Sequence, residues 1–146
     1  MARHSKFLMA ALLVVAATPA MTQENLKSVW DGVYTAEQAE RGKPLYAQSC
    51  ASCHGDRLTG GETAPPLAGG AFLSNWNGLK ADELFERIRK TMPQDKPGKL
   101  TRPAIADMMA FMFQVNEFPA GKEELSTKPE ALSQIRIDGT KPAGKK

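Results

Sequence analysis

Hydrophobic and polar positions, together with capping signals, predict helices in three stretches of the chain. The first, 35–47, begins with a Thr-x-x-Gln capping box formed by Thr35 and Gln38. The second covers 82–90 and the third 101–116, where apolar residues recur every three or four positions. The pattern predicts an all-α chain.

The segment 55–78, between the first and second of these stretches, is rich in Gly, Pro, Asn and Thr and lacks strand-like alternation. We predict a long irregular loop there. A long ordered loop in a small domain usually serves a function, such as covering a bound group.

The second helix is expected to stop at Thr91, because a residue that precedes a proline is disfavoured in the α region. Met92 precedes Pro93 and is therefore predicted to enter a loop that runs to the turn at 97–98. The third helix begins with Thr101 as its N-cap. Its buried face is predicted from i, i+3, i+4, i+7 spacing and consists of Ile105, Met108, Met109 and Met112.

The first twenty residues have the features of an export signal. Arg3, His4 and Lys6 precede the apolar run 7–17, and small residues follow at 18–20. The run is too short to span a bilayer, so we expect a cleaved signal peptide at 1–20 and a periplasmic protein without a stable membrane anchor. An uncleaved anchor is the alternative.

Net charge and chain length limit the functions and the number of domains that the chain can have. The whole chain carries 19 basic and 16 acidic residues, and removal of the signal peptide leaves a net charge of about +1. No basic run with interleaved aromatics suggests nucleic acid binding. About 126 residues remain after cleavage, which is enough for one domain.

The most specific motif is C-x-x-C-H, formed by Cys50, Cys53 and His54. This spacing is typical of covalent c-type haem attachment, in which the two thiols bond one porphyrin and the histidine ligates its iron. A zinc site would need two more ligands at suitable spacing, and a redox dithiol is expected after a strand, whereas a helix precedes Cys50. The motif therefore favours one covalent haem c over a zinc site, a redox dithiol or a structural disulfide.

The second axial ligand of the iron follows from elimination only in part. His4 and His54 are the two histidines, and His4 leaves with the signal peptide. The remaining candidates for this ligand are a methionine, a less usual donor such as lysine or an amine terminus, and water. The three methionines of the last helix are expected to pack in the core. Met92 lies outside any periodic face, and we predict it as the sixth ligand; the alternative is a loop methionine that covers the haem without bonding iron.

Over 35–118 the chain resembles class I cytochromes c, with a capped helix before C-x-x-C-H, a Pro-Leu pair after it, a methionine loop and an apolar last helix. The resemblance implies a cytochrome c fold of three to five helices around one haem. It implies a crossing of the first and last helices, for which the matching positions are Gly42, Tyr46, Met108 and Phe111. It also implies that the carbonyl of Pro65 accepts a hydrogen bond from the ligand histidine.

A second resemblance rests on T-M-P-x-x-x-P-G-x-L at 91–100 and F-P-A-G at 118–121. These motifs are similar to those of small bacterial cytochromes associated with quinoprotein dehydrogenases. The resemblance implies an electron carrier, not an enzyme, between a PQQ-dependent alcohol or sugar dehydrogenase and a terminal oxidase. The alternatives are a haem enzyme or ligand sensor with an open sixth site, and a cytochrome subunit held permanently by a dehydrogenase.

Two segments lie outside this domain, an N-terminal extension at 21–34 and a C-terminal tail at 119–146. Both could dock a partner. Apolar residues in the tail predict that it packs partly onto the domain and frays only at 139–146. They are Leu125, Leu132, Ile135 and Ile137.

Overall fold

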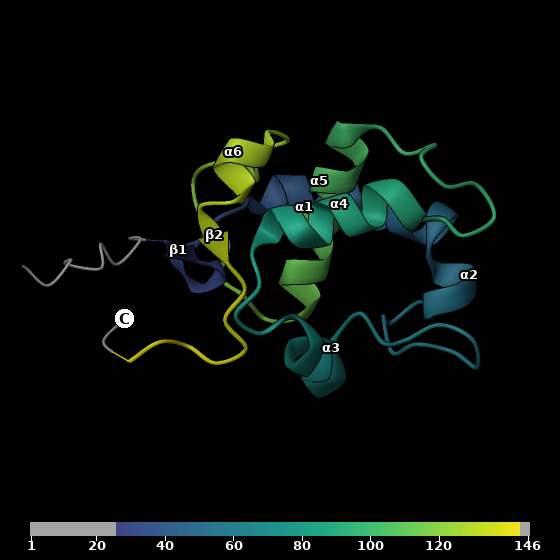
Figure 1. Cartoon of the computed structure of the whole chain (residues 1–146), viewed down its shortest axis with the longest axis horizontal. Coiled ribbons are helices and arrows are strands. Elements are labelled where there is room, and N and C mark those ends of the chain that lie inside the picture. Colours follow the sequence, from purple (N-terminus) through teal and green to yellow (C-terminus); the bar gives the residue numbers. More distant parts are fainter. Residues whose placement is uncertain (1–25, 144–146) are drawn as a thin grey trace, which may run out of the picture.

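The computed structural model describes residues 26–143 and is mostly helical (Figure 1). A parallel pair of two-residue strands joins the two ends of this range. In chain order, the helices and strands are β1 (Lys27–Ser28), a 3-10 helix (Val29–Asp31), α1 (Ala36–Ser49), α2 (Ala51–His54), α3 (Gly69–Trp76), α4 (Ala81–Thr91), α5 (Arg102–Val115), α6 (Pro129–Leu132) and β2 (Ile135–Arg136).

Helices α1 and α5 form the centre of the fold and pack closely at Gly42. A Cβ atom on Gly42 would lie 1.9 Å from the carbonyl oxygen of Asp107, so only a glycine allows this approach of the two backbones. One turn further along α1, the ring of Tyr46 lies 5.5 Å from that of Phe111, centroid to centroid. The crossing therefore uses the positions that the family resemblance implied.

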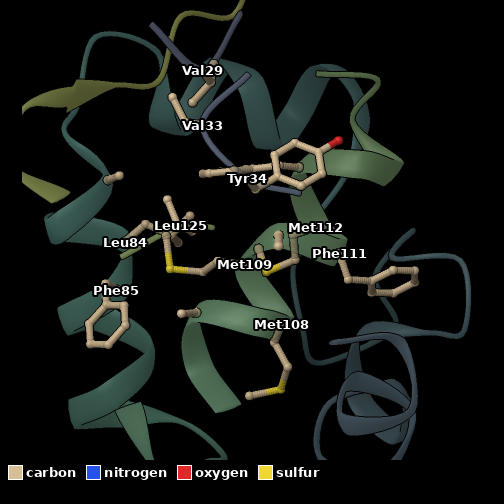
Figure 2. Close-up of a cluster of buried hydrophobic side chains, with 14 of the residues drawn as sticks. Val29, Val33, Tyr34, Leu84, Phe85, Met108, Met109, Phe111, Met112 and Leu125 are labelled. Atoms are coloured by element: carbon tan, nitrogen blue, oxygen red, sulfur yellow. The ribbon is translucent and has the colours of Figure 1, made fainter. Parts of the chain in front are cut away.

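The core surrounds α5 on several sides. Ile105, Met108, Met109 and Met112 are all buried, as their spacing predicted. Met109 extends towards Leu84 of α4 and Leu125 of the tail, whereas the ring of Phe111 points to the other side of α5 (Figure 2). Met109 thus fills space between α4, α5 and the tail.

The prediction of an unbroken loop at 55–78 was wrong, because α3 forms within it. Phe72 of this helix is buried, and Leu73 and Trp76 pack partly against the core. The two glycines that open α3, Gly69 and Gly70, are poor helix formers and conceal the helical spacing of these apolar residues. Residues 55–68 remain irregular.

The capping box predicted at the start of α1 is only half formed. The Thr35 hydroxyl accepts a hydrogen bond from the Gln38 backbone N–H, at 3.1 Å. The Gln38 side chain instead bonds the tail: its amide donates to the Leu125 carbonyl at 3.0 Å and accepts from the Leu125 N–H at 2.6 Å. A short-range capping rule cannot anticipate a partner 87 residues away.

The extension and the tail pack against each other and onto the domain. Lys27 pairs with Ile135 and Ser28 with Arg136 in the parallel strands. The indole N–H of Trp30 donates to the Asp138 carbonyl at 2.9 Å. The four apolar tail residues singled out from the sequence, Leu125, Leu132, Ile135 and Ile137, are all buried.

The predicted signal peptide at 1–20, with His4, lies outside the described residues, as does Met21. Within 26–143, no helix is both long and apolar enough to cross a bilayer.

Candidate haem site

The C-x-x-C-H motif forms a separate helical turn at the end of α1. Helix α1 ends at Cys50, its C-cap. The N–H groups of Cys53 and His54 then donate to the Cys50 carbonyl at 3.2 and 2.9 Å. On one turn, residues three apart lie on the same side. Cys50 is half-buried and Cys53 exposed, and both thiols are free of disulfide bonds. The turn therefore presents two thiols to one side.

The surroundings of Cys50 disfavour the charged form of its thiol. Burial, followed by the charge of Cys53, raises the pKa of the Cys50 thiol to about 11. Its sulfur lies 3.9 Å from the sulfur of Met108. A thiol with a raised pKa is a weaker nucleophile at neutral pH, which does not favour Cys50 as the attacking thiol of a redox dithiol.

His54 is buried at the end of the turn, with 7% of its surface exposed. Its Nδ1 lies 2.8 Å from the carbonyl oxygen of Pro65. A carbonyl oxygen only accepts, so this contact places the ring proton on Nδ1 and leaves the Nε2 lone pair available to a metal. The contact joins two residues singled out from the sequence.

Tyr46 supports the same turn from α1. Its hydroxyl donates to the carbonyl of Gly55, the residue after His54, at 2.8 Å. Burial raises the pKa of Tyr46, so the hydroxyl stays protonated and able to donate at neutral pH. The family resemblance placed Tyr46 only at the crossing of the first and last helices, since a hydrogen bond to a backbone carbonyl leaves no signal in the sequence.

Met92 ends α4 in the predicted manner. Its backbone N–H donates to the Ile88 carbonyl at 2.9 Å, while its φ of −121° and ψ of 152° are extended. The side chain is half-buried. The loop that follows, 92–101, lies at the same end of the long axis as α2 (Figure 1). By contrast, Met108, Met109 and Met112 are almost fully buried in the core.

Arg57 and Trp76 follow the motif in the sequence, in the segment 55–78. Arg57 is exposed, and Trp76 is half-buried with its ring 6.3 Å from that of Phe72.

These residues fit a covalently attached haem. The two thiols share one helical turn, the His54 ring has its Nδ1 engaged and its Nε2 free for iron, and a methionine stands outside the helices at the same end of the fold. Thiol, imidazole and thioether are the groups that haem c uses for attachment and axial ligation. Within 26–143, no three His, Cys, Asp or Glu side chains are grouped so that they could hold a metal ion.

Comparison with known proteins agrees with this chemistry. Residues 37–112, just over half of the chain, match the family model described as "Cytochrome C oxidase, cbb3-type, subunit III". A solved structure, described as the sulfane dehydrogenase SoxCD from Paracoccus pantotrophus, has a similar fold, with a TM-score of 0.52 and 21% identity. The similarity covers 90% of this chain and 72% of that one. No curated protein matches the chain in sequence.

Proposed function

Because the chain belongs to the cytochrome c family described by the cbb3-type oxidase subunit III model, we propose that it carries single electrons between proteins in the periplasm. The family carries covalent haem c, and the size of the domain is consistent with one haem. Bound haem c supplies a one-electron couple at its iron. The signal peptide proposed at 1–20 supports export to the compartment where such haems are attached.

The observation that carries the proposal is the bond between His54 Nδ1 and the Pro65 carbonyl, at 2.8 Å. This bond fixes the tautomer and orientation of the ring and raises the basicity of Nε2, as expected for an axial ligand. We assign Cys50 and Cys53 to covalent attachment and His54 to one axial position. Pro65 then serves as the residue that orients the ligand.

Met92 is the residue we assign to the second axial position. Its break from α4 places it in a loop instead of the core, and a thioether favours ferrous iron and raises the reduction potential. With His54 and Met92 both bound, no position is left for oxygen, peroxide or a substrate. This ligand set supports an electron carrier over a haem enzyme or gas sensor.

Exposure of the reduced protein to carbon monoxide tests the carrier function. A carrier with both axial positions filled is expected to keep its reduced spectrum under carbon monoxide and to take up one electron per chain in a reductive titration. Rapid carbon monoxide binding by the folded protein at neutral pH would instead support a haem enzyme or a gas sensor.

The proposed redox partners are a PQQ-dependent alcohol or sugar dehydrogenase as donor and a terminal oxidase as acceptor. The T-M-P-x-x-x-P-G-x-L motif at 91–100, which carries Met92, supports this assignment. A purified quinoprotein dehydrogenase supplied with its substrate is expected to reduce the oxidised protein without an added mediator. No reduction over a wide range of salt concentrations would rule that donor out.

A cytochrome subunit held within a dehydrogenase is the second candidate. The fold is similar to that of a chain from a sulfane dehydrogenase structure, over 90% of the present chain, which includes segments beyond the family match. Gel filtration of the native protein separates the two cases. A free carrier elutes at the size of one small domain, whereas a subunit co-elutes with dehydrogenase activity.

A further inference from the structure

The loop that carries Pro65 needs support from outside itself. Pro65 and Pro66 have no backbone N–H to donate, so these two residues can only accept backbone hydrogen bonds. On one side the loop is tied to Leu58, whose carbonyl accepts from the N–H groups of Leu67 and Ala68 at 2.8 and 3.2 Å. Leu58 is fully buried and has a φ of 59°, in the left-handed region. The Leu67 carbonyl and the next free N–H, that of Gly69, find another partner.

That partner is the side chain of Asn116. Its Nδ2 donates to the Leu67 carbonyl at 3.0 Å, and its Oδ1 accepts from the Gly69 N–H at 3.0 Å. Nδ2 also donates to the Met112 carbonyl at 2.8 Å. Two carbonyls and one N–H face the amide, so its orientation is determined by its partners. With 8% of its surface exposed, Asn116 is a buried polar group, and both polar atoms of its side chain have hydrogen-bond partners.

Asn116 connects the loop to the central helices of the fold. It is the C-cap of α5, and its own backbone N–H donates to the Met112 carbonyl at 3.0 Å. Helix α5 is held against α1 by the close approach at Gly42. A single side chain therefore relates the positions of Leu67 and Gly69 to the central helices.

We propose that Asn116 is a positioning residue for His54. By holding Leu67 and Gly69 it fixes the Pro65 carbonyl, which in turn holds the Nδ1–H of His54 and sets the orientation and basicity of the ring. This inference rests on the proposed role of His54 as an iron ligand. An asparagine that served only as a helix cap would affect stability but not the ring of His54.

The test uses two variants and one matched control. Asn116→Ala removes all three bonds, and Asn116→Asp keeps the side-chain volume but turns a carboxylate oxygen towards the Leu67 and Met112 carbonyls. Asn77→Ala is the control, because Asn77 Oδ1 also accepts from a distant backbone N–H, that of Gly139, at 2.8 Å. This control bond lies at the tail and not at the Pro65 loop.

The readouts are the solvent exchange rate of the His54 Nδ1 proton and the midpoint potential of the holoprotein. Selective isotope labelling of histidine makes the first readout specific, because His54 is the one histidine left after signal cleavage. Both Asn116 variants are expected to exchange about tenfold faster, which corresponds to the loss of one or two hydrogen bonds. A weaker Nδ1–H bond also lowers the basicity of the ligand, so the potential is expected to rise. The Asn77→Ala variant is expected to match wild type in both.

Wild-type exchange and potential in Asn116→Asp, at full haem content, would overturn the proposal. If Asn116→Ala fails to incorporate haem, the test of the positioning role rests on the isosteric Asn116→Asp variant. A wrong assignment of His54 as an iron ligand would be detected by a different measurement. In that case the His54 ring of the wild-type reduced protein would lack the resonance shifts of an imidazole bound to haem iron.

Discussion

Buried polar side chains hold the candidate site together at the scale of single residues. The hydroxyl of Tyr46 bonds the residue after His54, and the amide of Asn116 bonds the loop that carries Pro65. At the other end of α1, the amide of Gln38 bonds the tail. Each bond joins a core helix to an irregular segment, so each fixes a segment that has no regular structure of its own.

Tyr46→Phe tests whether one of these bonds matters to the haem site. The substitution keeps the ring against Phe111 and removes only the bond to the Gly55 carbonyl, at a cost of about 1 kcal/mol in the free energy of unfolding. We expect a decrease of roughly 4 °C in Tm and an altered reduction potential, measured by thermal unfolding and by redox titration of the holoprotein.

Tyr34→Phe is the control for this variant. The Tyr34 hydroxyl is also buried and donates to a backbone carbonyl, that of Phe118, at 2.6 Å. We expect a similar loss of stability and an unchanged potential. Equal shifts of potential in both variants would show that Tyr46 has no specific role at the His54 turn.

At the scale of helices, the crossing of α1 and α5 determines how the parts of the candidate site are placed relative to one another. The two thiols and His54 follow directly after α1, while Asn116 ends α5. The angle and distance between these helices therefore set the distance between the turn that carries His54 and the loop that carries Pro65. A change at the crossing is expected to reach the site although it lies two turns away from Cys50.

Gly42→Ala tests the crossing. The new methyl group would lie 1.9 Å from the Asp107 carbonyl oxygen, which belongs to a helix backbone and cannot rotate away. Overpacking of this kind costs about 3 kcal/mol or more, against about 1 kcal/mol gained from helix propensity. We expect a marked loss of stability in denaturant unfolding, together with reduced haem incorporation.

Gly70→Ala is the matched glycine in α3. A Cβ on Gly70 meets nothing within 4 Å, so the substitution is expected to be neutral or to stabilise by about 0.5–1 kcal/mol. Wild-type stability in Gly42→Ala would mean that the two helices pack less closely than described.

The fold as a whole shows which features a sequence can predict. Helices α1, α4 and α5 follow from spacing and caps, because a residue's own neighbours in the chain determine them. The position of Met92 follows from Pro93 for the same reason. The partners of Gln38 and Asn116 lie 87 and 49 residues away, and α3 is stabilised by burial of Phe72, so none of these follows from local pattern. Local rules therefore predicted the ligand candidates, and tertiary contacts determine what supports them.

The near-infrared absorption of the oxidised holoprotein is the most direct test of the proposed His54 and Met92 ligation, because a methionine-to-iron bond gives a characteristic band there. Met92→Ala is expected to abolish the band and to lower the reduction potential, since a thioether stabilises ferrous iron. Met109→Leu, a volume-conserving change in the core, is expected to keep the band. An unchanged band in Met92→Ala would contradict the assignment and transfer the ligand role to another methionine.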